Sequence, residues 1–206
     1  APVERAVELA KQIDADPHLH FAGLLVYPSN ATIRPALQEV LARLEQAGIG
    51  VESVSGGGTG AALQAHEVPE LTELRVGTYV FYDWTSVVKG WTTLDDCAMR
   101  VRATVVSRPS ETRAILDSGS KTLTSDTIDG GYGHIVEYPE ARIYQLNEEH
   151  AYVDVSACER RPAIGEIVHV IPVHTCVVTN LHNQLYGVRG ETVEVTWSVA
   201  ARGLVW

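Results

Sequence analysis

The first stretch with chemical potential is a run of glycines, Ser55-Gly56-Gly57-Gly58-Thr59-Gly60, between an apolar alternating segment and a string of helix formers. Bare backbone amides at the start of a helix form an anion site, and a phosphate group is the natural ligand. A flexible turn is the plain alternative. A Walker A loop is excluded because it needs a lysine, whereas Gly56-x-Gly58-x-x-Ala61 fits the loose dinucleotide fingerprint.

A second candidate is His174-Thr175-Cys176, which lies in the segment EIVHVIPVHTCVVTNL. Its many β-branched residues predict a strand, with positions 174 and 176 on one face about 7 Å apart. An imidazole and a thiolate favour Zn²⁺, and two local protein ligands would leave coordination positions for water or substrate. The alternative is a buried pair that binds no metal.

Two further clusters carry titratable groups. Asn147-Glu148-Glu149-His150 joins two predicted strands, and it is either a source of acid/base groups and metal support or a polar β-turn. Chemistry that needs an amine has only Lys11, Lys89 and Lys121 available. Lys121 is the best placed of these, because it follows Asp117-Ser118-Gly119-Ser120 after a predicted strand.

The first part of the chain alternates helices and strands. Helical spacing of apolar residues, buried apolar runs and stop signals predict helices at 3–13, 31–47 and 59–65 and strands at 21–27, 51–55 and 73–83. This alternation is typical of a parallel sheet with crossover helices. Three parallel strands are too few for a complete sheet of this kind, so we expect the later strands of a barrel.

After about residue 97 the helical spacing ends and short β-rich runs follow. They predict strands at 98–107, 113–117, 134–137, 142–147, 150–155, 166–173, 184–188 and 192–199. The second half is therefore expected to be an antiparallel β domain. We place the boundary within 84–97 and divide the chain into domains 1–90 and 91–206.

The bulk composition excludes several classes of function. A net charge of −10 with only 16 Lys and Arg argues against a nucleic-acid partner. No run of 18 apolar residues and no secretory signal pattern occurs, so we expect no membrane partner. The three cysteines Cys97, Cys158 and Cys176 are an odd number and far apart, which favours a reducing compartment, the cytoplasm.

Seven stretches, taken in order, resemble the bacterial D-threonine aldolase and D-serine dehydratase family. They are FAGLLVYPSN, VSGGGTGA, ELRVGTYVFYD, LDSGSKTLTSD, LNEEHAYVDVS, GEIVHVIPVHTC and VTNLHNQLYGVRG. The resemblance spans essentially the whole chain. It implies an alanine-racemase-type enzyme that binds pyridoxal 5'-phosphate in an α/β barrel of eight strands, followed by a β domain, usually as a homodimer. This chain resembles only the later barrel strands and the β domain.

The resemblance also implies roles for particular residues. The cofactor phosphate would be held from two neighbouring loops, and a tyrosine and a histidine would lie near the cofactor or substrate. The first loop would contribute Gly57, Gly58 and Thr59, and the second would contribute Gly77, Thr78 and Tyr79. The tyrosine is Tyr27 and the histidine is His150. Relatives often have Tyr-x-Gly-His where this chain has Tyr27-Pro28-Ser29-Asn30. His174 and Cys176 match the family's metal site. Many aldolases of the family have Asp at the position of Cys176 and bind Mn²⁺, so the cysteine shifts the expected ion toward Zn²⁺.

The implied reaction is cleavage of a D-3-hydroxy amino acid, D-threonine giving glycine and acetaldehyde. A dehydratase acting on D-serine or D-3-hydroxyaspartate is the alternative. Because none of the three lysines has a matching context, we expect the Schiff-base lysine on an N-terminal portion outside this chain. Two readings remain beside the lyase: a non-catalytic fragment that keeps the phosphate and metal sites, and a nicotinamide oxidoreductase based on the glycine fingerprint.

Overall fold

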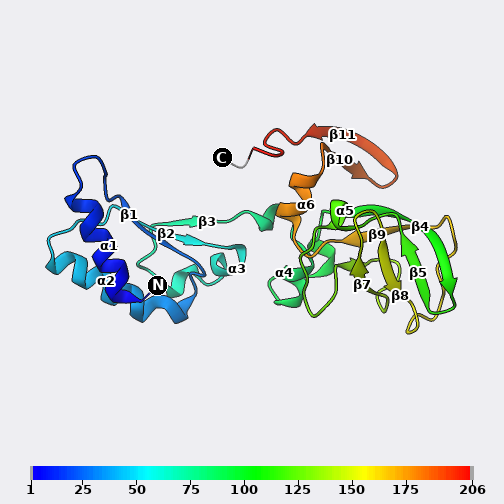
Figure 1. Ribbon diagram of the computed structural model, residues 1–206, viewed down its shortest axis with the longest axis horizontal. Helices are drawn as coiled ribbons and strands as arrows, with labels where there is room; N and C mark the ends of the chain where they lie inside the picture. Colours follow the sequence, from blue (N-terminus) through cyan, green and yellow to red (C-terminus); the bar gives the residue numbers. More distant parts are fainter. Residues whose placement is uncertain (1, 205–206) are drawn as a thin grey trace. The chain divides into compact units, whose positions relative to one another are not determined.

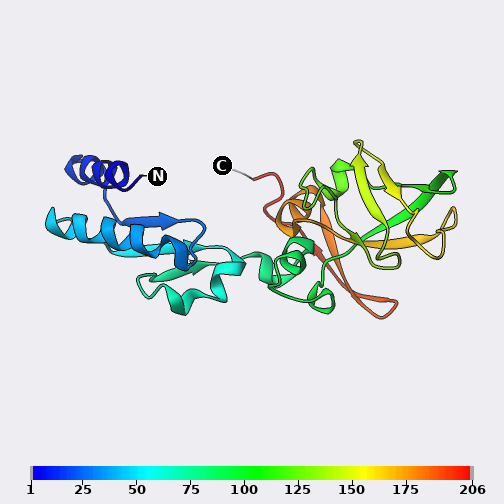
Figure 2. The same ribbon diagram turned by 90° about the horizontal axis from the view of Figure 1, so that it is seen from below.

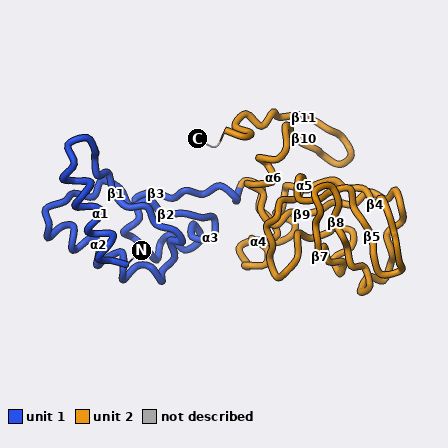
Figure 3. Tube along the Cα trace, viewed as in Figure 1, with its two compact units in different colours: residues 1–79 blue, residues 80–206 orange. Residues whose placement is uncertain are grey.

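The computed structural model describes residues 2–204, and the chain divides into two units, Ala1–Tyr79 and Val80–Trp206 (Figure 3). The division falls earlier than the predicted boundary after residue 90. Its physical reason is that Phe81 already packs against the core of the second unit and accepts a hydrogen bond from the Ala98 amide at 2.8 Å. The assignment of the two ranges to a cofactor-binding portion and a metal-carrying portion stays a prediction.

Unit 1 is a parallel α/β unit, as the alternating pattern predicts. Its elements are α1 (Val3–Ala15), β1 (Gly23–Val26), η1 (Ala31–Ile33), α2 (Arg34–Gln46), β2 (Ser53–Gly57), α3 (Thr59–Ala62), η2 (Ala65–Glu67), β3 (Glu73–Arg75) and η3 (Thr78–Val80) (Figure 1). The three strands are parallel in the order β1-β2-β3. All three therefore end at one edge of the sheet, which is where parallel sheets place their binding residues.

Apolar side chains at helical spacing hold unit 1 together. One cluster lies between α1 and α2 and includes Val7, Val40 and the fully buried Leu44. A second joins α2 to β2 through Leu37 and Val54. The predicted helix at 31–47 is thus confirmed, with Pro35 in its first turn as helix starts allow.

The predicted strand at 73–83 is wrong beyond Arg75. The chain leaves the sheet after β3, makes the turn η3, and enters the short helix α4 (Trp84–Val88). Asp83 fixes the start of α4, because its carboxylate accepts the Ser86 amide at 2.9 Å.

Unit 2 is built on antiparallel β structure, as predicted. Its elements after α4 are η4 (Leu94–Asp96), β4 (Val101–Ser110), β5 (Arg113–Leu116), α5 (Ser120–Leu123), β6 (His134–Ile135), β7 (Arg142–Leu146), β8 (Ala151–Asp154), β9 (Ile167–Ile171), α6 (Thr175–Leu181), β10 (Gln184–Arg189) and β11 (Thr192–Ser198). Six of the strands form one sheet in the order β6-β9-β4-β5-β8-β7.

The sheet curls toward a barrel. The Tyr132 amide, just before the edge strand β6, donates to the Ile143 carbonyl of the other edge strand, β7, at 3.1 Å. Side chains of β4 alternate, so that Val101, Ala103 and Val105 are buried in the core, as the two-residue period of a strand requires.

The hairpin β10–β11 forms a two-stranded sheet of its own, an arm apart from the six-stranded sheet (Figures 1 and 2). Leu185 packs against the main core, whereas Tyr186 and Trp197 are exposed. None of the helices between residues 2 and 204 has the length and apolar character needed to cross a bilayer.

Candidate functional site

The glycine run lies where β2 ends, and its glycines permit contacts that side chains would block. A Cβ at Gly56 would lie 2.8 Å from the Ser29 hydroxyl, and one at Gly57 would lie 2.6 Å from Nη2 of Arg75. Ser29 is fully buried, and its hydroxyl accepts the Gly57 amide at 3.0 Å. The glycines therefore bring the ends of β1, β2 and β3 into contact at one edge of the sheet.

Two of the amides predicted to hold a phosphate already have partners within the chain. Gly57 donates to Ser29, and Gly58 donates to the Arg75 carbonyl at 3.2 Å. The amides of Thr59 and Gly60 open the helix α3, where the first N–H groups have no partner within the helix. Gly58 has φ +98°, a conformation that favours glycine and turns the chain into α3. Within the described residues, the amides of Thr59 and Gly60 are thus the ones of this turn that the helix itself leaves without a partner.

The structure brings several of the other predicted residues to the same turn. The exposed Tyr27 ring contacts the glycines, because Cβ atoms built at Gly57 and Gly58 would lie 3.1 and 3.2 Å from it. Thr59 is buried, and its hydroxyl accepts the Tyr79 amide at 3.1 Å. Gly77 and Thr78 lie between β3 and this contact. The cofactor roles of all these residues stay predictions.

Arg75 is the residue of this turn that the sequence analysis missed. Its guanidinium hydrogen-bonds the Ser55 hydroxyl and the Val26 carbonyl, so a cation stands beside the glycines. No local signal marked it, because the predicted strand continued to residue 83, whereas β3 ends at Arg75, at the edge where the strand ends of a parallel sheet meet. A bare turn with two open amides and a neighbouring cation fits an anionic group such as a phosphate.

The prediction that His174 and Cys176 lie on a strand is wrong. The strand β9 ends at Ile171, His174 is the N-cap of α6, and Cys176 lies in the first turn of that helix. His174 is half exposed and Cys176 is exposed. The alternating strand geometry therefore does not apply to the pair, although both side chains still belong to one helix start.

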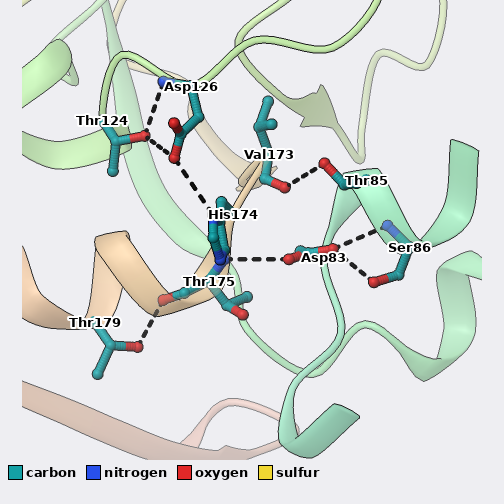
Figure 4. A network of polar contacts seen from close by, with 9 residues as sticks. All are labelled: Asp83, Thr85, Ser86, Thr124, Asp126, Val173, His174, Thr175 and Thr179. Carbon is teal, nitrogen blue, oxygen red and sulfur yellow. Dashed lines mark hydrogen bonds and ion pairs between the residues drawn. The ribbon is translucent and has the colours of Figure 1, made fainter. Parts of the chain in front are cut away.

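A buried carboxylate fixes this helix start. Asp83, itself 2% exposed, accepts the Thr175 amide at 3.4 Å in addition to the amide and hydroxyl of Ser86 (Figure 4). The Thr85 hydroxyl donates to the Val173 carbonyl at 2.8 Å. One segment, Asp83–Thr85, thus holds the backbone on both sides of His174.

The imidazole of His174 faces a second carboxylate. Its Nδ1 lies 3.6 Å from Oδ2 of Asp126 (Figure 4). Asp126 in turn accepts a hydrogen bond from the Thr124 hydroxyl at 3.2 Å. The sequence analysis missed both Asp83 and Asp126, because each is far from position 174 along the chain and only folding brings them there.

The donor chemistry at His174 and Cys176 fits a divalent ion, because imidazole and thiolate are the ligands that Zn²⁺ prefers. Within the described range 2–204, no three side chains of His, Cys, Asp or Glu gather as a metal site. A metal role for His174 and Cys176 stays a prediction.

His150 lies in the turn between β7 and β8, the polar turn that was one of the two readings. It is exposed, and its carbonyl accepts the Asn147 amide at 2.9 Å. Ser120 donates its amide to the Asn147 carbonyl at 2.8 Å, so this turn packs on the start of α5. A catalytic role for His150 stays a prediction.

Lys121, predicted to be the best placed of the three lysines, lies in an ion-pair cluster. Its Nζ lies 2.8 Å from a carboxylate oxygen of both Glu148 and Glu149. Hydrogen bonds to Glu148 and then Glu149 raise the pKa of Lys121 above its ordinary value, so the neutral amine that a nucleophile needs is disfavoured. Lys121 instead ties α5 to the turn that carries His150.

Comparison with known proteins identifies the fold class of the chain. The chain resembles an alanine-racemase-like protein from Idiomarina loihiensis, at a TM-score of 0.76 and 22% identity over 95% of this chain and 59% of that one. It also resembles the D-threonine aldolase of Filomicrobium marinum, at a TM-score of 0.77 and 29% identity over 98% of this chain and 59% of that one. The fold is thus alanine-racemase-like: later strands of an α/β barrel followed by an antiparallel β domain.

Sequence relatives make the assignment more specific. The putative serine dehydratase domain matches residues 98–188. A D-threonine aldolase from Arthrobacter sp. is 31% identical over 95% of this chain and 55% of its own length. A D-threo-3-hydroxyaspartate dehydratase from Delftia sp. is 29% identical over 65% of this chain and 40% of its own length. The chain belongs to the D-threonine aldolase and D-serine dehydratase family, and it spans about half the length of the curated relatives it matches.

Proposed function

We propose that the chain is part of a lyase that uses pyridoxal 5'-phosphate and a divalent metal to cleave D-3-hydroxy amino acids, of the D-threonine aldolase type. D-threonine would give glycine and acetaldehyde. The observation that carries this proposal is the 31% identity to a D-threonine aldolase across 95% of the chain. Membership of a family of D-amino acid lyases supports the general chemistry, and the choice of D-threonine is the finer proposal.

The Schiff-base lysine is proposed to lie on a further N-terminal portion of a longer enzyme. The chain spans 55% of the Arthrobacter aldolase, which leaves room for such a portion. Lys121 is held by two carboxylates, which argues against its use as the nucleophilic amine. A homodimer is proposed on the resemblance to the family. A location in the cytoplasm is proposed on the buried thiols of Cys97 and Cys158, which form no disulfide.

Unit 1 is proposed to hold the cofactor phosphate at the glycine turn. The amides of Thr59 and Gly60 would donate to it, Arg75 would contribute positive charge, and the glycines would keep the approach open. Tyr27 would pack beside the bound group, since its ring already contacts Gly57 and Gly58. When bound, pyridoxal phosphate supplies an electron sink for negative charge that develops at the substrate Cα.

Unit 2 is proposed to hold the metal through His174 and Cys176. When bound, a divalent ion supplies a Lewis acid for the substrate hydroxyl group. The chain's own contribution is to fix the helix start of α6, through Asp83 and Thr85, so that imidazole and thiolate are presented together. His150 is proposed as an acid or base near the substrate.

A dehydratase is the second candidate, and Cys176 favours it. The solved structures of D-threo-3-hydroxyaspartate dehydratase include a Cys→Ala variant in a metal-free form and a His→Ala variant two positions earlier in that chain. This chain has the same His-x-Cys spacing at 174 and 176. The substrate would then be D-serine or D-3-hydroxyaspartate. Loss of water would give an enamine, and hydrolysis of its imine tautomer by water would release ammonia and leave pyruvate or oxaloacetate.

The test uses the complete enzyme loaded with pyridoxal phosphate and either Zn²⁺ or Mn²⁺, supplied with D-threonine, D-serine and D-threo-3-hydroxyaspartate in turn. The aldolase reading expects glycine plus acetaldehyde from D-threonine. Pyruvate from D-serine, or oxaloacetate from the hydroxyaspartate, favours the dehydratase. L-threonine is the stereochemical control, and borohydride reduction followed by peptide mass analysis locates the lysine. Metal binding without cofactor absorbance or product would support the non-catalytic alternative.

A further inference from the structure

We propose that Asp126 is a positioning residue for His174: its carboxylate holds Nδ1 of the imidazole and so directs Nε2 toward the divalent metal. This inference rests on the metal role proposed for His174 and Cys176. It adds a residue that the sequence did not mark as part of the site.

The geometry of the pair is the first support. Oδ2 of Asp126 lies 3.6 Å from Nδ1 of His174, a distance of an ion pair that is longer than a hydrogen bond (Figure 4). The two side chains are 43% and 44% exposed, so each has room to close the gap. The contact uses Nδ1, and the ion pairs and hydrogen bonds of the described chain leave Nε2 of His174 unused.

Asp126 is itself held in place. Its Oδ2 accepts the Thr124 hydroxyl at 3.2 Å, and its own amide donates to the Thr124 oxygen at 3.1 Å. The oxygen that faces His174 is therefore the one that Thr124 anchors. A carboxylate fixed in this way can fix the ring next to it.

Thr124 has a backbone conformation that a threonine rarely adopts. Its φ is +69°, in the left-handed region, where a β-branched residue is an outlier. It is 5% exposed and ends the short helix α5, so the surrounding fold holds it there. Such strained residues concentrate at functional sites, and here the strained turn aims Asp126 at the imidazole.

The chemistry of histidine ligands explains the use of this contact. A metal-bound histidine commonly donates its other N–H to a carboxylate, which sets the tautomer and the orientation of the ring. With the proton on Nδ1 facing Asp126, the lone pair of Nε2 is available to a metal. Asp126 is thus assigned a supporting role rather than a place among the ligands.

The first experiment needs no metal. In the whole 206-residue chain, long-range ¹H–¹⁵N spectra at alkaline pH report the tautomer of each of the eight histidines, and His174→Ala identifies the relevant signals. We expect the Nδ1–H tautomer at His174 and a shift toward Nε2–H in Asp126→Ala. Asp95→Ala is the matched control, because it removes a carboxylate from the same unit that has no hydrogen-bond or ion-pair partner in the described chain.

The second experiment measures Zn²⁺ affinity by competition and the spectrum of bound Co²⁺. Asp126→Ala is expected to weaken Zn²⁺ binding about 10- to 100-fold. It should keep the cobalt–thiolate charge-transfer band, because Cys176 is unchanged. Asp126→Asn keeps the size of the side chain and serves if the alanine variant does not fold, with an intermediate loss expected. Asp95→Ala should bind as the wild type does.

The outcomes separate the two proposals. If wild type binds Co²⁺ with the thiolate band, but neither tautomer nor affinity responds to Asp126, the positioning role is overturned and the metal site stands. If wild type binds neither Zn²⁺ nor Co²⁺, the metal role proposed for His174 and Cys176 fails, and the positioning inference fails with it.

Discussion

Asp83 and Thr175 are 92 residues apart in the sequence, yet the buried carboxylate of Asp83 accepts the Thr175 amide at 3.4 Å. The same carboxylate caps α4 through Ser86. One side chain therefore joins two helix starts, and the second of them carries His174 and Cys176 on either side of the bonded amide.

Asp83→Ala should destabilise unit 2 and disturb the positions of His174 and Cys176, the proposed metal ligands. Loss of an N-cap costs about 0.5–2 kcal/mol, and an orphaned buried amide costs about 1–3 kcal/mol, so we expect a loss of about 2–4 kcal/mol in the free energy of unfolding. Urea unfolding measures it. Thr85→Val, which removes the hydroxyl hydrogen bond to the Val173 carbonyl but keeps the one from the Thr85 amide, should cost about 1 kcal/mol. Equal losses of unfolding free energy in Asp83→Ala and Thr85→Val would contradict the conclusion that the Asp83 carboxylate holds the starts of both α4 and α6.

Gly57→Ala should weaken pyridoxal phosphate binding by the complete enzyme. The new methyl group would lie 2.6 Å from the Arg75 guanidinium and 3.1 Å from the Tyr27 ring, so both must move. Overpacking of this kind costs about 1–3 kcal/mol, roughly a tenfold or greater loss of affinity. Titration followed by the cofactor's absorbance measures it. Gly50→Ala is the control, since a methyl group there meets nothing within 4 Å; unchanged binding in Gly57→Ala would remove the glycine turn from the cofactor site.

Cys176→Asp should change the metal preference. A carboxylate in place of a thiolate favours harder ions, so Zn²⁺ affinity should fall while Mn²⁺ binding is kept or improved. Parallel competition titrations with the two ions give the ratio of affinities. His174→Ala should weaken the binding of both ions. A Zn²⁺ affinity that is unchanged in Cys176→Asp would count against the thiolate as a ligand.

Glu166 should make unit 2 sensitive to acid. Burial opposes its ionisation, but hydrogen bonds from Tyr138, the Ala163 amide and Arg160 outweigh burial and lower the pKa below 4.5. A carboxyl group with a lower pKa in the folded state stabilises folding above its unfolded pKa, and that contribution is lost as the pH falls through the folded value.

Wild type should therefore lose stability below about pH 4.5 more steeply than Glu166→Gln, so that the difference between them narrows in acid. Urea unfolding between pH 7 and pH 3 measures this difference. Glu159→Gln, at a position without a hydrogen bond in the described chain, should follow the wild-type curve. A gap between wild type and Glu166→Gln that does not depend on pH would contradict the assignment.

The periodicity of apolar residues was enough to predict the helices and strands that bury one face. Leu37, Val40 and Leu44 recur at helical spacing and fill the core as α2, and the alternating residues of β4 do the same for the sheet. The glycine run was also visible in the sequence: Gly56 and Gly57 end β2, and Gly58 turns the chain into α3. In each case the signal and the structure involve the same short stretch of chain.

Only the tertiary structure decided what happens at His174. Val177, Val178 and Thr179 favour a strand locally, yet they lie in α6, because Asp83 and Thr85 fix the preceding backbone and Val178 is buried in the core of unit 2. Arg75 and Asp126 were missed for the same reason. A charged side chain shows its role only through the groups beside it, and those groups come from elsewhere in the chain.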